Sequence, residues 1–350
     1  MSLDGVENAP QRSMIRSDYI DSSSSVSNKM KMIRIMIARS KAFGIWTAIL
    51  LLMPVVIQCG RSDGRVMSEE ELRVASSQHI DTTYFCSMTA ADSIAERDLW
   101  DAVSAEAWIL VEDSSGLLIS AKNIDKRMYP ASLTKMMTCI LSLERGNLAD
   151  SIEITEDVCL TTDSRVRPGD CYLLGNMIDE MMLQSDNNAA TALAQYISGD
   201  IPAFCRLMNE KAAYLGMDST HFANPNGMPN DSTYSSARDL LVLARYCMRD
   251  SAFAAIVGTP FMDIPLVDGR HLPCDNTNLL LRSYEGCIGV KTGYTRDAGS
   301  CLASAATRDG VTLFLVLLNS RSRSSRFTES ALLLDHGFSL MARRNAAQQQ

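Results

Sequence analysis

The sequence lacks several patterns that mark common catalytic and metal-binding sites. Its ten cysteines include no C-x-x-C pair, so neither a zinc cluster nor a thioredoxin-type redox site is indicated. No H-E-x-x-H motif is present to support metal catalysis. The four histidines lie in unremarkable contexts, which argues against a Ser-His-Asp hydrolase; they are His79, His221, His271 and His336. We therefore expect no metal and no cofactor.

An excess of positive charge is also missing from most of the chain. The formal net charge is −8, and residues 1–60 carry +3, which leaves −11 on residues 61–350. An acidic main region does not attract nucleic-acid phosphates, so we expect no nucleic-acid binding. At 350 residues and 46% hydrophobic composition, the chain can bury the core of one large domain or two small ones.

Residues 1–28 include a run of four serines and show no hydrophobic period. A composition of this kind does not build a packed core. We expect this stretch to be disordered or absent from the mature protein. Its length suggests Met30 or Met32 as the true start.

A basic flank followed by an apolar run characterises residues 29–59. Residues 29–41 hold five basic side chains and no acid, and AFGIWTAILLLMPVVIQC then runs apolar to Cys59. This is an export signature, which a buried core helix explains poorly. The run is short of the ~20 residues of a spanning helix, so a cleaved signal peptide and a retained membrane anchor both stay open. Lipidation at Cys59 is less favoured, because Gln58 stands where a small residue is expected.

The rest of the chain divides into a linker, a folded domain and a tail. Residues 60–103 are polar, acidic and weakly patterned, as in a linker; residues 104–343 carry regular patterns, and residues 344–350 form the tail. In an exported domain, Cys159 and Cys171 are the nearest candidates for a disulfide. The cysteines are equally consistent with small buried apolar residues.

Strand patterns occur near the start and the end of the folded region, and helical patterns occur between them. The strands are EAWILVE and LLISA near the start, then CIGVKTGY, GSCLASAAT and VTLFLVLLNS near the end, the last two joined by Arg308-Asp309-Gly310. Helical periodicity marks residues 132–145, 176–198, 202–215 and about 324–343. This order predicts an α/β (α+β) domain, in which helices flank one antiparallel sheet and a mainly helical region is inserted.

Ser132 and Lys135 lie three residues apart at the start of the first predicted helix, so their side chains share a face. Ser132 alone could be an N-cap, but a capping box has Glu or Gln three positions later. A cation there faces the positive end of the helix dipole, at a cost of about 0.3–1 kcal/mol. A lysine disfavoured as a cation has a lowered pKa and can accept the proton of a serine hydroxyl. The pair suggests a nucleophile and its base, although this spacing also arises by chance.

Two further motifs are each weak alone. Ser185 and Asn187 stand between helical segments in LQSDNNAATALAQ, where a capping serine and a turn asparagine are the simpler interpretation. Lys291-Thr292-Gly293 closes an apolar strand in GVKTGYT, and a strand that ends in a glycine turn is common. Together and in this order, however, S-x-x-K, S-x-N and K-T-G form the signature set of the serine penicillin-recognising enzymes.

Over roughly residues 104–340 the sequence resembles the D-alanyl-D-alanine carboxypeptidases of the low-molecular-mass penicillin-binding proteins, peptidase family S11. The supporting stretches are YPASLTKMMT, NPNG, YSSARDL, NTNLLL and GVKTGYT with AGSCL. The resemblance implies a β-lactamase/DD-peptidase-like fold, a place in the bacterial cell envelope, and two kinds of partner: peptidoglycan stem peptides ending in D-Ala-D-Ala, and β-lactam antibiotics. Since little sequence follows LLDHGF, we expect any membrane attachment through the N-terminal segment.

The resemblance also implies catalytic roles for four residues. Ser132 would attack the carbonyl between the two D-alanines and form an acyl-enzyme, which releases the terminal D-alanine. Lys135 would be the base in acylation. Ser185 would relay a proton to the leaving amine, and Asn187 would bind the substrate backbone through its side-chain amide.

Substrate binding is implied for the strand that carries K-T-G. Lys291 and Thr292 would hold the terminal carboxylate, and Gly293 would let the peptide lie along the strand edge. The backbone N–H groups of Ser132 and Tyr294 would form the oxyanion hole. Tyr294 stands where a histidine is common in the family, and the residue between Ser185 and Asn187, Asp186, stands where a glycine is frequent. These departures bear on specificity more than on activity, because both positions contribute mainly backbone.

The same scaffold also supports other functions. A class A β-lactamase needs a glutamate that drives deacylation, and no E-x-x-L-N stretch follows Ser185. A transpeptidase would use the same acyl-enzyme with an amine acceptor. An inactive or sensory penicillin-binding protein is disfavoured, because all the reactive side chains are present.

Overall fold

The computed structural model of the protein describes residues 68–83, 90–159 and 161–348. The predictions for residues 1–28 and 29–59 lie outside the described residues. In the described part of the chain, no helix has both the length and the apolar character needed to cross a bilayer. The described residues belong to one unit, Met67–Gln350.

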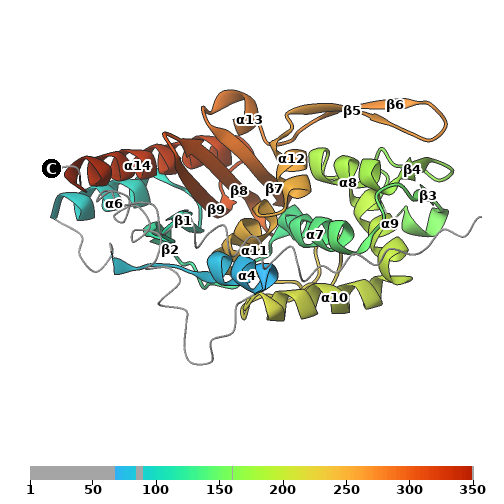
Figure 1. The fold of residues 1–350 in the computed structure, drawn as a ribbon, viewed down its shortest axis with the longest axis horizontal. Helices are drawn as coiled ribbons and strands as arrows, with labels where there is room; N and C mark the ends of the chain where they lie inside the picture. The colour runs from blue at the N-terminus through green and yellow to red at the C-terminus, as the bar shows by residue number, and fades with distance from the viewer. Residues whose placement is uncertain (1–67, 84–89, 160, 349–350) are drawn as a thin grey trace, which may run out of the picture. The chain divides into compact units, whose positions relative to one another are not determined.

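A five-stranded antiparallel sheet has the order β2-β1-β9-β8-β7 (Figure 1). Its strands are β1 (Ala107–Glu112), β2 (Leu118–Lys122), β7 (Cys287–Thr295), β8 (Gly299–Arg308) and β9 (Val311–Ser320). The chain therefore leaves the sheet after β2 and returns at β7, which confirms the prediction of one antiparallel sheet with an inserted region. Asp309 and Gly310 join β8 to β9, and both have the positive φ of a tight hairpin turn.

Both faces of the sheet are covered by helices, because strand β1 alternates its side chains between two apolar clusters. Ile109 and Val111 lie in the larger cluster with α11 (Ala237–Met248), whereas Trp108 and Leu110 lie in the smaller one with α14 (Ser325–Gln348). Helix α14 runs further than the predicted 324–343 and includes the described part of the predicted tail.

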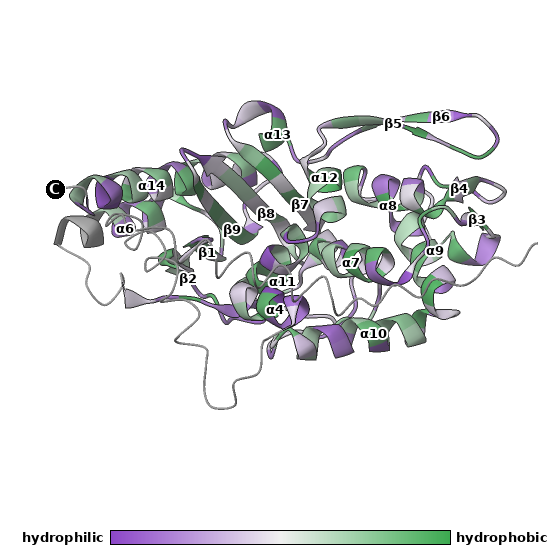
Figure 2. Ribbon diagram, viewed as in Figure 1, coloured by the Kyte–Doolittle hydropathy of each residue, from purple (hydrophilic) through white to green (hydrophobic). Residues whose placement is uncertain are grey.

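The inserted region is mainly helical, as expected. It contains α7 (Lys135–Arg145), α8 (Leu174–Leu183), α9 (Asn187–Ser198), α10 (Ile201–Tyr214), α11, α12 (Ser251–Gly258) and the short α13 (Leu280–Ser283), with the 3-10 turns η1 (Ala131–Thr134) and η2 (Glu156–Val158). Two hairpins, β3 (Ser151–Glu153) with β4 (Cys171–Leu173) and β5 (Phe261–Pro265) with β6 (His271–Asp275), were not predicted. Helix α10 carries hydrophobic and hydrophilic residues along its length (Figure 2), and buries Phe204, Met208 and Ala212 at four-residue intervals.

The segment predicted as a linker, residues 60–103, has two helices in its described part: α4 (Glu69–Gln78) and α6 (Ala90–Ala102). Helix α4 begins with a capping box between Ser68 and Glu71. Its end is held by the buried side chain of Arg245, whose Nη1 donates to the Ser77 and His79 carbonyls at 3.2 and 2.7 Å. The described part of this segment therefore differs from the extended tether that the sequence predicts. Helix α4 needs few apolar residues to pack against the domain, because the buried Arg245 side chain binds the carbonyls at its end.

The cysteines in the described residues are all free thiols. Cys159 and Cys171, the candidates for a disulfide, are therefore unpaired, and the alternative of partly or fully buried thiols applies. Burial raises the pKa of Cys139 and Cys247, which keeps these thiols protonated.

Candidate active site

Ser132 lies on η1, and Lys135 is the first residue of α7. The helix predicted for 132–145 thus begins with a 3-10 turn, and it ends at Arg145 as expected. Ala131, just before the serine, has φ 48°, a left-handed conformation that costs a non-glycine residue about 1–2 kcal/mol. Gly227 packs against this turn and has φ +79°. A Cβ atom added at Gly227 would lie 1.9 Å from the Ala131 carbonyl oxygen, so only glycine fits there.

The Lys135 amine is fully buried and contacts three polar groups. Its Nζ lies 3.1 Å from Ser132 Oγ, 2.8 Å from Asn187 Oδ1 and 2.6 Å from the Asn226 carbonyl oxygen. Burial lowers the pKa of Lys135 to about 7, while the charge of Asp186 acts in the opposite direction. A neutral amine has two hydrogens and one lone pair. Donation to the two oxygens leaves the lone pair available for the proton of the Ser132 hydroxyl.

The S-x-N residues lie between α8 and α9, where the predicted helix of 176–198 is interrupted. Ser185 has φ 63°, and its partly exposed hydroxyl makes no hydrogen bond to the residues that the structure describes. Asp186 caps α9 by accepting from the Ala189 N–H. Asn187 begins α9, and its amide nitrogen points at Met228 Sδ at 3.5 Å. The loop therefore brings Asn187 to Lys135.

Lys291 is 1% exposed on β7, one of the two edge strands of the five-stranded sheet, and its Nζ donates to the Thr292 carbonyl at 3.2 Å. Burial and the nearby charges of Lys135 and Arg326 hold the pKa of Lys291 well below its usual range. Among the residues that the structure describes, no acidic side chain pairs with it. A bound anion would supply the missing countercharge.

Thr292 is buried, and its hydroxyl lies 2.7 Å from the Thr277 hydroxyl. Gly293 packs against the nucleophile: an added Cβ would lie 3.1 Å from the Ser132 backbone nitrogen and 3.2 Å from the Pro130 carbonyl. Tyr294 is 46% exposed, with the Arg323 guanidinium 4.3 Å from its ring centre.

Sequence reasoning missed several supporting groups. The Asn226 carbonyl belongs to NPNG, and the glycine of that stretch was the available signal. Arg326 is buried at the start of α14 and donates to the Gly293 carbonyl at 2.9 Å. In the sequence SRSRSSRF, nothing distinguishes the buried Arg326 from the exposed Arg321 and Arg323. Thr277 lies in NTNLLL, but only the fold brings it to Thr292.

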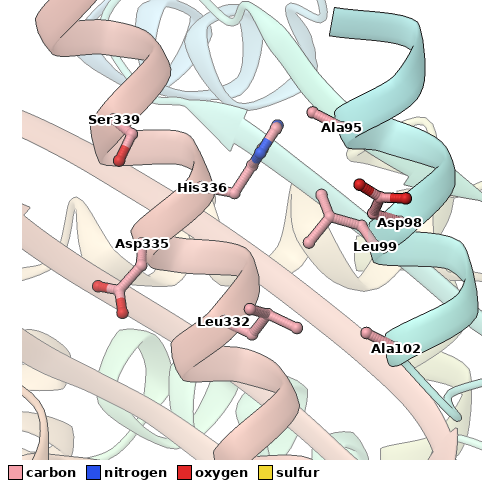
Figure 3. Close-up of a pocket in the computed structure, with 8 residues that line it drawn as sticks. All are labelled: Ala95, Asp98, Leu99, Ala102, Leu332, Asp335, His336 and Ser339. Atoms are coloured by element: carbon pink, nitrogen blue, oxygen red, sulfur yellow. The ribbon is translucent and has the colours of Figure 1, made fainter. Parts of the chain in front are cut away.

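A groove of about 380 Å³ lies between α6 and α14, and none of the predicted site residues line it (Figure 3). His336 and Ser339 of α14 line it together with Asp98 of α6. Asp335 is directed away from His336 and accepts hydrogen bonds from Tyr284 and Arg308 instead. Asp335 therefore does not act as the partner of His336 in this groove.

Comparisons with known proteins agree with this arrangement. A family model described as D-alanyl-D-alanine carboxypeptidase, Peptidase_S11, matches residues 91–322. The D-alanyl-D-alanine carboxypeptidase DacF of Bacillus subtilis is 31% identical over 245 residues, which are 68% of this chain and 63% of that protein. This chain thus covers less than two thirds of that relative. DacB2 of Mycobacterium tuberculosis is 32% identical over 67% of this chain and 83% of that protein.

Solved structures give the same result. The crystal structure of the Streptomyces K15 DD-transpeptidase superposes with a TM-score of 0.64 at 30% identity. The superposition covers 68% of this chain and 98% of that one. The predicted fold class is therefore confirmed.

Proposed function

This chain belongs to the D-alanyl-D-alanine carboxypeptidase family of serine peptidases, and on that premise we propose that it removes the terminal D-alanine from peptidoglycan stem pentapeptides. The observation that carries the proposal is the buried Lys135 amine, 3.1 Å from Ser132 Oγ with a pKa of about 7. A base with a pKa near the working pH is the most effective proton acceptor.

Acylation begins when Lys135 Nζ takes the proton of Ser132 while Oγ bonds to the carbonyl carbon of the penultimate D-alanine. The carbonyl oxygen becomes negative, and the backbone N–H groups of Ser132 and Tyr294 stabilise it, at about 2.7–4 kcal/mol per donor. The contact of Gly293 with the Ser132 backbone supports this assignment, because it holds β7 beside the nucleophile. The C–N bond then breaks, and Ser185 passes the proton to the leaving amine.

Deacylation reverses the proton transfers. Lys135, neutral again, takes a proton from water as the water oxygen attacks the ester carbon. The ester bond breaks, and Ser132 recovers its proton. Asn187 binds the peptide through its amide and keeps Lys135 oriented through its oxygen, which already accepts from Nζ at 2.8 Å.

The substrate carboxylate binds Lys291 and the Thr292 hydroxyl. Lys291 is a buried amine with no acidic partner among the described residues. A carboxylate there raises the pKa of Lys291, so binding is accompanied by proton uptake when this amine is neutral in the free protein. β-Lactams carry a carboxylate and a strained amide, and they form the same ester on Ser132.

We assign the protein to the bacterial cell envelope, which fits the basic and apolar pattern of residues 29–59. That segment acts as an export signal or as a membrane anchor. A second candidate activity, transpeptidation, is favoured by the structural likeness to a protein described as a DD-transpeptidase. It uses the same acyl-enzyme but transfers it to an amine.

The mass of the intact protein after incubation with penicillin tests the proposal. We expect wild type to gain the mass of one penicillin and Ser132→Ala to gain none. A Ser132→Ala protein that gains the same mass would show that another residue is the nucleophile. Adding a D-amino acid acceptor to a substrate peptide separates hydrolysis from transpeptidation, because only the latter yields an exchanged peptide.

A further inference from the structure

Asp186 is the member of the S-x-N motif that has no role in the proposed reaction, yet it is 6% exposed and well bonded. Its carboxylate accepts from the Ser164 hydroxyl at 2.7 Å, from the Arg165 N–H at 2.9 Å and from the Ala189 N–H at 3.0 Å. Two of these donors belong to the loop between η2 and β4, and the third belongs to α9. The carboxylate thus joins two segments that are distant in the sequence.

Asn188 strengthens the same junction. Its Oδ1 accepts from the Thr161 N–H at 3.1 Å, and its Nδ2 donates to the Thr161 and Val166 carbonyls at 3.1 and 3.3 Å. Asn187, which lies between these two anchored residues, is the one that reaches Lys135. Ser185 on the other side has a positive φ, a conformation that persists only where the surroundings enforce it.

The carboxylate of Asp186 has no cation among its hydrogen-bond donors. The Arg165 guanidinium turns to the Pro273 carbonyl at 2.8 Å and to Glu180 at 3.7 Å. Within the described residues, Asp186 forms no ion pair, so its charge is free to act on Lys135. Three hydrogen-bond donors and the positive end of the α9 dipole compensate this buried charge in place of a cation.

We propose that Asp186 is a positioning residue of the active site: its carboxylate locks the loop at Ser164 and Arg165 onto the start of α9, fixes Asn187 against Lys135, and supplies a fixed negative charge to the Lys135 amine. The proposal rests on the proposed function, since it assigns Lys135 as the base. The fixed charge sets the pH at which that base is neutral.

The groups around Lys135 determine the sign of the effect. Ser132, Asn187 and the Asn226 carbonyl face it as uncharged groups. The charge of Lys135 lowers the pKa of Lys291 on β7, so Lys291 loses its own proton readily and adds little positive charge. Asp186 is the acid that raises the pKa of Lys135, against the effect of burial. Removing its charge therefore makes Lys135 neutral at a lower pH.

The rate of acylation by a fluorescent penicillin, measured from pH 5 to 9, tests both parts. In Asp186→Asn we expect the acidic limb of the pH–rate profile to move to lower pH by roughly one unit, because the charge is removed. We also expect slower acylation at every pH, because the amide nitrogen faces a backbone N–H from which a carboxylate oxygen accepts a hydrogen bond in wild type. Asp170→Asn is the matched control: Asp170 is also buried and bonded in this loop, but it does not act on Lys135, so the limb stays in place. Ser164→Ala keeps the charge and loses the hydroxyl's bonds to Asp186 and to the Val166 N–H, so we expect slower acylation at every pH and no shift of the acidic limb.

Three outcomes are decisive. If the acidic limb of the pH–rate profile of Asp186→Asn lies at the wild-type pH, the charge of Asp186 has no role in setting the state of Lys135. If Ser164→Ala is acylated at the wild-type rate, the bond between Ser164 and Asp186 has no role in positioning Asn187. If Asp186→Asn does not fold, the acylation rate of Ser164→Ala still tests the positioning part of the proposal. A wild-type protein that is not acylated at all refutes the proposed function instead.

Discussion

The state of Lys135 can be tested through stability, without any substrate. In the folded protein its pKa is about 7, against the usual 10.5 of an exposed lysine. Folding therefore favours the neutral amine. Between pH 7 and 10.5 the unfolded chain binds about one more proton at this residue than the folded chain does. Stability then rises with pH across that window, by about 1.4 kcal/mol per pH unit.

Lys135→Met removes this titration and keeps a long apolar side chain in the same space. The free energy of unfolding of wild type, minus that of the variant, should increase by about 2.5 kcal/mol from pH 7.5 to 9.5. Titrating groups that do not interact with Lys135 cancel in the difference. Lys291 is affected where Lys135 is charged, because that charge lowers its pKa, so the comparison is made above pH 7, where Lys135 is neutral in wild type. The lost contacts to Asn187 and Asn226 shift the difference by an amount that depends little on pH.

Urea unfolding followed by circular dichroism, at five pH values between 7 and 10, measures that difference. A difference that is constant from pH 7.5 to 9.5 would mean that Lys135 has an ordinary pKa, and would refute the assignment of a neutral base.

Three further results are expected. Acylation by penicillin should be half-maximal near pH 7 and fall about tenfold per pH unit below it, if Lys135 must be neutral; a stopped-flow profile that is flat from pH 5 to 8 would contradict this. Gly227→Ala should slow acylation by about 10²-fold, because its Cβ displaces the Ala131 carbonyl beside the nucleophile, whereas Gly310→Ala, with a similar φ and open space, should acylate normally. Arg245→Met should lower the urea-unfolding free energy by about 3–5 kcal/mol, because Asp113 and the carbonyls at the end of α4 lose a buried donor; a loss under 1 kcal/mol would mean that α4 is not anchored there.

The pairing of Ser132 with Lys135 could be predicted from the sequence, because both lie within one turn and local helix geometry fixes their relation. The sheet was predictable as well, since its strands carry short, mainly apolar runs that are bounded by turn residues. The contact of Arg326 with Gly293 was not predictable, because it depends on how α14 packs on the sheet. The contact of Arg245 with the end of α4 was not predictable either. The polar composition of residues 60–103 predicts a linker, and only the fold shows that a buried arginine binds this segment.

The residue between Ser185 and Asn187 shows a different limit. Comparison of motifs identifies Asp186 only as a departure from the usual glycine. The sequence does not say that Ser164, in a polar loop, folds back onto it. The proposed role of the Asp186 carboxylate therefore follows from the fold and not from the motif.

The central claim is tested most directly by the release of D-alanine from a peptide ending in Lys-D-Ala-D-Ala. We expect wild type to release free D-alanine over many turnovers, penicillin to stop the release, and Ser132→Ala to release none. No release by folded, penicillin-reactive wild type, or equal release by Ser132→Ala, would contradict the account.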